Sequence, residues 1–546
     1  MLVATSQTDD RNVSSMTRGK RLALVWWLSF GLMLLGLLVP ILVVEVPPLL
    51  DYPDHLARCF FLAFGPQDPV MRRIFAVRWS VIPNLAMDLI LPPLMHVMPP
   101  LVAGRLVVAL SVLLPASGSV ALSRACFRRW SFWQLGVGLV TYNAVFLAGM
   151  LNFQLAVGVA LWGAACWIAL TPRHPFGGAL AGAGFALVAF LFHLFGYFFF
   201  ALLIVSNELA AFRQDGPSRY REWRSISGRG TAVLTALIGP VVLYLISPFG
   251  HTSGSVKFHS VPHKLLLLLA PVMGYSLAST ITVALALLAT LVIWRRQGKL
   301  EVAPLASIAL PALFLIYWML PNRAKGGAWI DLRIPILLGF MLFATVIPRR
   351  LAWREATLAT VALSALFIGR MTYLTWVWEG SRQDIVDVRQ VLTKVLPGRR
   401  LLVVDGGQLK DRGKTSPPYT FGADRLGSSY RHDGAFALID RRAFWSDIFA
   451  IPGQQLLVPL PPYDLSGDGG ILPPRKVGVL ADFATVAPTL DPRSFILGWP
   501  SKFDYVMVLG ANNVSNIDGL LPRYLTLLDD RGIAALFAIK HEGAPP

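Results

Sequence analysis

The sequence is poor in charged side chains and in cysteine. Charged residues make up 15% of the 546 positions, whereas soluble domains carry about a quarter. The three cysteines, Cys59, Cys126 and Cys166, are spaced in no metal-binding pattern. Cys126 and Cys166 lie in or beside apolar runs, which argues against a disulfide framework. The composition therefore excludes an ordinary soluble domain and a disulfide-stapled scaffold.

The short motifs of several enzyme classes are also missing. The chain contains no P-loop, no GxSxG nucleophile elbow, no HExxH zinc motif and no glycine-rich dinucleotide fingerprint. Each of these motifs places particular side chains or backbone amides around a substrate or cofactor. The sequence therefore gives no support to the reactions that depend on them.

Apolar runs dominate the first two thirds of the chain. Hydrophobic residues make up 55% of the sequence, and a helix needs roughly 20 apolar residues to cross a bilayer. We predict about eleven membrane spans from runs of this kind. They lie at 22–44, 101–122, 133–149, 152–170, 176–192, 195–212, 231–248, 277–294, 303–320, 333–348 and 356–373. The shorter, proline-rich run at 83–99 predicts a helix that lies on the outer membrane surface.

Basic clusters between the apolar runs predict the topology. They are Arg124 with Arg128 and Arg129, Arg173, the run 213–229, Arg295 with Arg296 and Lys299, and Arg349 with Arg350 and Arg354. Because Lys and Arg favour cytoplasmic loops, we predict a cytoplasmic tail at 1–20. An all-α membrane domain follows at 21–374, with a large outer loop at 45–100. We place the protein in the inner (plasma) membrane. The same topology accounts for the formal net charge of +18, so the bilayer is a predicted partner and nucleic acid is not.

The composition changes near Thr375, and residues 375–546 predict a small extracytoplasmic α/β domain. Ser381 and Asp384 have the spacing of a capping box. The helix after them would place one apolar face at Ile385, Val388, Val391, Leu392 and Val395. Three apolar runs predict buried strands, at 401–404, 477–480 and 505–509.

Polar groups gather in the outer loops, where the topology predicts few cations. The first loop begins with Asp51-Tyr52-Pro53-Asp54-His55-Leu56-Ala57-Arg58. A carboxylate, an imidazole and a guanidinium in that segment provide a base and an anion-binding group, and Asp51 and His55 are our candidate catalytic residues. Further candidates for a substrate cavity are Asp54, Asn84, Asn152, His193, Tyr197, His263 and Asp331.

Structural roles compete with each of these interpretations. Asp51 is also placed to cap the helix that begins near Pro53, and Asn152 to cap the span that follows it. His193 is equally explained as a core histidine between two helices. A zinc site at His251, His259 and His263 would need a spacing that matches no standard pattern.

The combination resembles the GT-C superfamily of integral-membrane glycosyltransferases. In that family a first span leads into a large outer loop that begins with an acidic motif, and Asp51 to Arg58 is similar to that motif. Leu91-Pro92-Pro93-Leu94 and Gly104-Arg105-Leu106 resemble stretches of the aminoarabinose- and mannose-transferring branches. Many relatives carry two adjacent acids, whereas Tyr52 and Pro53 separate Asp51 from Asp54 here, which leaves the base and any divalent metal open.

The resemblance implies a polyprenyl-phosphate-linked sugar as donor and a glycolipid, polysaccharide or protein as acceptor. Asp51 would be the general base, and no cofactor is implied. The candidates for holding the donor phosphate are Arg58, Lys257, His259, Arg323, Lys325 and Arg333. Two other classes stay open. A transporter or lipid flippase would carry ionisable groups at mid-span, and a non-catalytic membrane scaffold would not need the polar outer loops.

Overall fold

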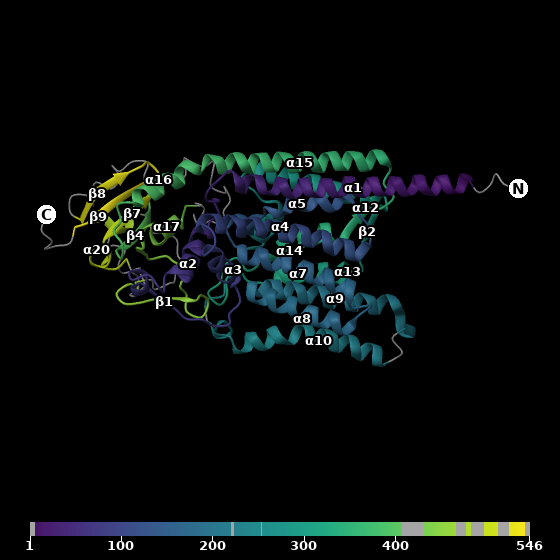
Figure 1. The fold of residues 1–546 in the computed structure, drawn as a ribbon, viewed down its shortest axis with the longest axis horizontal. Coiled ribbons are helices and arrows are strands. Elements are labelled where there is room, and N and C mark those ends of the chain that lie inside the picture. The colour runs from purple at the N-terminus through teal and green to yellow at the C-terminus, as the bar shows by residue number, and fades with distance from the viewer. Residues whose placement is uncertain are drawn as a thin grey trace.

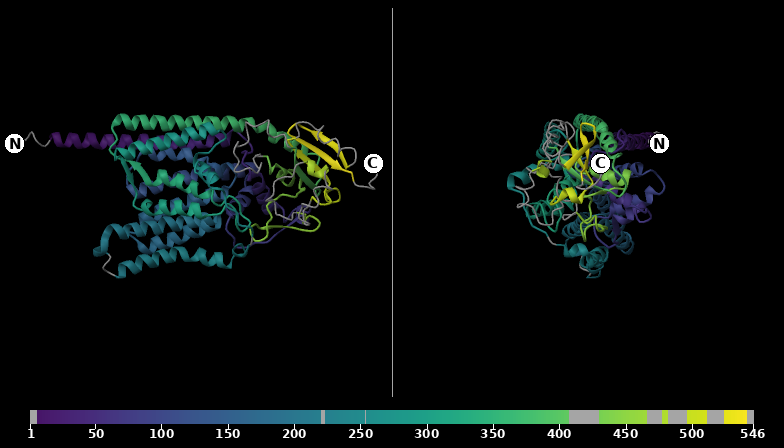
Figure 2. Two further views of the ribbon diagram at one scale, coloured as in Figure 1. Left: turned by 180° about the vertical axis from the view of Figure 1, so that it is seen from behind. Right: turned by 90° about the vertical axis from the view of Figure 1, so that its left-hand side faces the viewer.

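The computed structural model describes residues 6–219, 223–252, 254–406, 430–465, 477–481, 496–510 and 524–540. Long helices run side by side in one bundle, and a smaller part that contains a β-sheet sits at one end of it (Figure 1). The Ser6 end of the first helix and the last two strands lie at opposite ends of the long axis, as the view from behind also shows (Figure 2).

Eight helices in the described part of the chain are long and apolar enough to cross a membrane. Each contains at least 18 residues, which is close to the length that a bilayer core requires. They are α1 (Ser6–Leu42), α4 (Pro100–Phe127), α7 (Leu151–Leu170), α8 (Pro175–Phe192), α9 (Leu194–Arg219), α10 (Trp223–Ile246), α12 (Leu277–Arg296) and α15 (Trp353–Gly380). The chain is therefore a multi-span helical membrane protein, as its composition predicts.

The three other predicted spans are shorter apolar segments. α13 (Ala306–Met319) and α14 (Arg333–Thr345) begin or end beside a two-stranded sheet of β2 (Leu300–Val302) and β3 (Val346–Pro348), which shortens both helices. The predicted span at 133–149 is broken into η2 (Phe132–Val137), α5 (Gly138–Thr141) and α6 (Ala144–Leu147). Asn143 causes the second break, because its side chain accepts a hydrogen bond from the Phe146 amide and starts a new helix.

The first outer loop forms two helices at the end of the bundle, α2 (Tyr52–Phe64) and α3 (Ala86–Met95). The helix predicted in 83–99 is therefore present. α2 is buried along most of its length, because it packs between α3 and α4 of the bundle and the short helices of the C-terminal part. It is thus an internal element rather than an exposed one.

The C-terminal part is built on a five-stranded mixed sheet in the order β5-β4-β7-β9-β8. β4 is parallel to β5 and β7, whereas β9 is antiparallel to β7 and β8. The strands are β4 (Arg400–Asp405), β5 (Phe444–Trp445), β7 (Tyr505–Leu509), β8 (Leu525–Asp530) and β9 (Ala534–Ile539). The α/β prediction for this region is confirmed, and so are two of its three predicted strands.

Three details of that prediction are wrong. Residues 477–480 belong to the short helix α18 (Gly478–Ala481) instead of a strand. The capping box does not form, because Ser381 donates to the Trp378 carbonyl and Asp384 accepts from the Tyr430 hydroxyl. α15 also continues to Gly380, beyond the predicted end of the membrane domain. The apolar face of α16 (Arg382–Leu392) and its following turn is buried as predicted.

The first outer loop and the C-terminal part are joined directly. β1 (Phe75–Val77) pairs antiparallel with β6 (Leu457–Pro459), and the Asp54 carboxylate accepts a hydrogen bond from the Phe449 amide at 3.0 Å. The remaining short elements are η1 (Met71–Arg73), η3 (Pro248–His251), α11 (Val261–Leu267), η4 (Ala270–Val272), η5 (Asp433–Ala435), α17 (Phe436–Arg441) and α20 (Trp499–Lys502). The junction between bundle and sheet is therefore a continuous packed interface.

Candidate functional site

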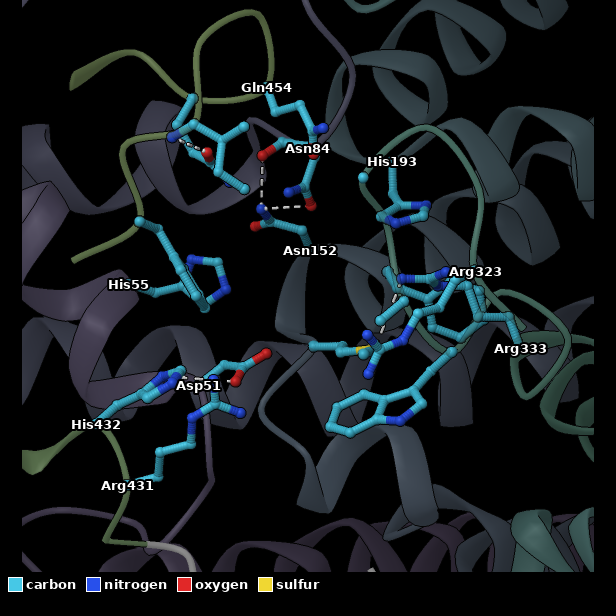
Figure 3. Close-up of a pocket in the computed structure, with 18 residues that line it drawn as sticks. Asp51, His55, Asn84, Asn152, His193, Arg323, Arg333, Arg431, His432 and Gln454 are labelled. Carbon is cyan, nitrogen blue, oxygen red and sulfur yellow. Dashed lines mark hydrogen bonds and ion pairs between the residues drawn. The ribbon is translucent and has the colours of Figure 1, made fainter. Parts of the chain in front are cut away.

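A polar cavity of about 170 Å³ lies at this junction. Its walls come from five segments that are far apart in the sequence: the start of α2, the approach to α3, the start of α7, the loops around α14, and the C-terminal part (Figure 3). The predicted site residues that line it are Asp51, His55, Asn84, Asn152, His193, Arg323 and Arg333. The expected convergence of the outer loops on one cavity is therefore present.

The backbone of Asp51 is held by the corner between α6 and α7. Its amide donates to the Ala148 carbonyl at 3.1 Å, and Gly149 lies beside it with a φ of +81°. A Cβ atom at position 149 would lie 2.6 Å from the Asp51 amide nitrogen, so only glycine fits. Within the described residues the Asp51 side chain makes no capping hydrogen bond to α2, and it projects into the cavity instead (Figure 3).

The Asp51 carboxyl has an unusual environment for an acid. Burial raises its pKa from 3.8 to about 7, while the charges of Arg431 and Arg333 act in the opposite direction. A carboxylate whose pKa lies near neutral pH binds a substrate proton more readily than an ordinary one, which is the property that general-base catalysis requires. Asp51 can therefore exchange a proton at physiological pH.

Two imidazoles flank this carboxylate. His432 Nδ1 lies 3.6 Å from Asp51 Oδ1 and 3.9 Å from Asp54 Oδ2. Burial lowers the pKa of His432 well below 6.5, helped by Arg431, and burial with Arg58 does the same to the pKa of His55. Phe449 lies between the two rings, in edge contact with both. Both imidazoles are therefore neutral at pH 7, and they orient Asp51 without competing for its proton.

Three guanidinium groups share the cavity with Asp51: Arg323, Arg333 and Arg431. Figure 3 shows Arg323 and Arg333 together on one wall, with Asp51 and Arg431 across from them. Arg333 is fixed by the thioether of Met150 and lies over the ring of Phe195, with 5.4 Å from Cζ to the ring centroid. Three cations and one carboxylate give the cavity a net positive charge, which favours an anionic ligand.

The opposite rim is a neutral polar wall. Asn152 donates to the Asn84 side chain and carbonyl, and its own oxygen accepts from the Met87 amide at 2.8 Å. Asn152 therefore satisfies the start of α3 rather than capping its own helix. His193 Nδ1 accepts from the Phe195 amide, so this ring is fixed at a helix boundary while it still lines the cavity.

Arg58 and Asp54 do not line the cavity. Arg58 makes two hydrogen bonds to Asp88, at 2.7 and 2.8 Å, and both side chains are almost fully buried. The prediction that Arg58 holds phosphate is wrong, because its guanidinium neutralises a buried carboxylate. Asp54 is committed to the Phe449 amide, so it attaches α2 to the C-terminal part.

Other predicted ligands lie outside the cavity and support its walls. His259 donates to Asp331 at 2.9 Å, His263 stacks on His259, and Lys257 pairs with Arg323 through backbone hydrogen bonds. Lys325 donates to the Gly250 carbonyl, and Tyr197 to the Leu237 carbonyl. In the described part of the chain, no group of three or more His, Cys, Asp or Glu side chains is placed to hold a metal ion.

The C-terminal part supplies residues that the sequence did not single out. They are Arg431, His432, Phe449, Ile451, Gln454 and Gln455. The adjacent arginine and histidine at 431 and 432 were the available signal, but an Arg-His pair in a polar domain has no distinctive spacing. Only the contact between this domain and the first outer loop gives these residues a common purpose with Asp51.

An apolar cleft of about 420 Å³ lies beside the polar cavity, between α9, α10 and the end of α13. Phe195 and Tyr244 line this cleft. Arg333 lies over the Phe195 ring, and Lys325 over the Tyr244 ring at 5.9 Å. A polar, cationic cavity and an apolar cleft are therefore neighbours.

Comparisons of the sequence with known proteins give no assignment. No protein-family model matches the chain, and no curated protein matches it significantly. The function is therefore argued from the site alone.

Proposed function

We propose that the protein is a membrane glycosyltransferase that uses a polyprenyl-phosphate-linked sugar. The observation that carries this proposal is one carboxylate with a pKa near 7 facing three arginines beside an apolar cleft. Such a donor has a phosphate, which arginine binds through charge-assisted hydrogen bonds, and a hydrocarbon tail, which suits the cleft. Its sugar would occupy the space between them.

In this mechanism Asp51 takes the proton of the acceptor hydroxyl or amine. The acceptor atom attacks the anomeric carbon with inversion, and the bond from that carbon to the phosphate oxygen breaks. The electron pair of that bond leaves with the polyprenyl phosphate. Arg323, Arg333 and Arg431 hold the charge that develops there, so positioning and charge stabilisation supply most of the rate.

The alternative of a transporter has less support. Arg370, an ionisable residue inside α15, donates to the carbonyls of Val272, Met273 and Tyr142. Glu208, in α9, accepts from the Trp167 indole. Both side chains fasten helices together, whereas a proton or ion pathway needs ionisable groups that can change partners.

We also propose that the shorter apolar segments complete an eleven-span domain, with the N-terminus in the cytoplasm and the sheet outside the plasma membrane. The placement of α1 and the sheet at opposite ends of the bundle supports this topology (Figure 1). A C-terminal alkaline phosphatase fusion should then be active and a fluorescent-protein fusion dark. The reverse pattern would contradict the topology.

The proposed activity can be tested with purified protein in nanodiscs. We would supply a panel of polyprenyl-phosphate hexoses and pentoses with a membrane-lipid extract as acceptor, and measure release of polyprenyl phosphate. Release above that from empty nanodiscs, with one donor preferred, is the expected result. Flux of a panel member across proteoliposomes without cleavage would instead favour the transporter, and absence of both binding and release would reject the proposal.

A further inference from the structure

A second concave surface lies at the other end of the helix bundle, between α1, α4 and α7. Its volume is about 690 Å³. Trp27, Phe30, Trp130 and Trp162 form its sides, and we call it the aromatic groove. It is lined by the Phe127 end of α4 and the Leu170 end of α7, whereas the polar cavity is lined by the opposite, Leu151 end of α7. The two sites are therefore separated by the length of the bundle.

The groove is built to accept something apolar. Small side chains, including Ala121, Ala125 and Ala169, leave the space open between the aromatic walls. Trp162 is fixed, since its indole donates to the Ser117 hydroxyl at 3.1 Å. Trp27 packs edge-on against Trp130 and is still 50% exposed. Ordered aromatic walls around small residues fit a hydrocarbon chain.

Three arginines stand at one end of this apolar surface: Arg124, Arg128 and Arg173. They come from the last turn of α4, from its C-cap and from the turn after α7. Among the described residues none of the three forms an ion pair with a carboxylate, whereas neighbouring Arg129 pairs with Glu301 at 2.7 Å. Arg124 lies over the Trp130 ring at 4.9 Å, which directs its charge to the mouth of the groove.

We infer that the aromatic groove is a binding site for an anionic phospholipid. An acyl chain would lie between the tryptophans, and the headgroup phosphate would accept hydrogen bonds from the three arginines. Basic pockets between membrane helices recognise anionic headgroups in this way, and the amphipathic tryptophans favour the same interfacial depth. The occupant is a structural lipid, distinct from the proposed donor, whose cavity lies at the far end of α7.

The test uses the full chain in nanodiscs made from equal amounts of phosphatidylglycerol and phosphatidylcholine. After transfer to detergent, native mass spectrometry measures which lipids stay bound. The wild-type protein should retain phosphatidylglycerol in preference to phosphatidylcholine. The triple variant R124Q/R128Q/R173Q should lose that preference by roughly a hundredfold, since each arginine at a membrane surface gains about fivefold in affinity for anionic lipid.

Two further variants keep the test decisive. R129Q removes one charge outside the groove and should keep the preference. A169W fills the groove without changing the charge and should lose bound lipid of both kinds, so it serves if the triple variant fails to fold. Equal retention of both lipids by the wild type, an equal loss in R129Q, or retention of inorganic phosphate without lipid would overturn the inference.

Discussion

Asp51→Asn is the most direct perturbation of the proposed mechanism. Asparagine keeps the shape of the side chain and removes the proton acceptor. The Asp51 backbone is held by Ala148 and Gly149, and within the described residues its side chain does not cap α2, so the fold should survive. Loss of a general base should lower the rate of sugar transfer by roughly 10²–10⁴-fold.

The same change has a signature in stability. Burial raises the pKa of Asp51 from 3.8 to about 7, so the fold favours the protonated carboxyl. The stabilisation from that protonated form is complete below about pH 4 and is lost as the pH rises through about 7. At about 1.4 kcal/mol per pH unit, the loss amounts to at most roughly 4 kcal/mol, and less because the side chain is 17% exposed to water. Asparagine does not titrate, so the variant should gain stability relative to the wild type across this range.

The assay combines turnover and apparent Tm in nanodiscs between pH 4 and 8. Asp464→Asn is the matched control, because Asp464 is exposed and lies outside the cavity. Wild-type turnover should rise with pH to a plateau above about 7. Near-normal turnover in the Asp51 variant, or a Tm difference that does not change with pH, would refute the reasoning.

Three other substitutions probe the site and its supports. Arg431→Gln should weaken donor affinity by roughly 10- to 100-fold, because it removes a charge-assisted contact to phosphate; titration of the donor against Arg399→Gln, an exposed control, would contradict this if both variants bind equally. Gly149→Ala should lower apparent Tm and turnover together, because it adds strain at a positive φ and a contact with the backbone that carries the base; Gly184→Ala, with open space around it, should change neither. Arg58→Met should cost about 3–5 kcal/mol of stability, since it leaves a buried carboxylate unpaired, while donor affinity in the folded fraction stays unchanged; the opposite outcome would restore Arg58 as a phosphate ligand.

Local sequence patterns predicted the helices well and their interruptions poorly. Apolar length identifies a span, which is why α4, α7 and α12 lie close to their predicted bounds. The run at 133–149 has the same hydrophobicity, yet Asn143 starts a new helix inside it. That break depends on one side-chain hydrogen bond, which hydropathy does not report.

The site was predictable where one segment carries its own signal. The acidic motif that begins at Asp51 has such a signal, and it lines the cavity. Arg58 belongs to the same motif but pairs with Asp88, thirty residues later, and this partner depends on how α2 packs on α3. The contribution of Arg431 and His432 depends on the contact between two parts of the protein, so no local pattern could report it.

The pairing of β1 with β6, and the cavity beside it, have a consequence for biosynthesis. Asp51 and Arg431 are separated by 380 residues. At ribosomal speeds of about 5–20 residues per second, roughly 20–80 s pass between the emergence of the first and the second. Throughout that interval the nascent chain has a carboxylate and two arginines at most, with no wall from β6 or Phe449 to close the cavity. A partly made molecule is therefore catalytically silent, and the enzyme can begin to consume a scarce lipid-linked sugar only after its last third has crossed the membrane and docked.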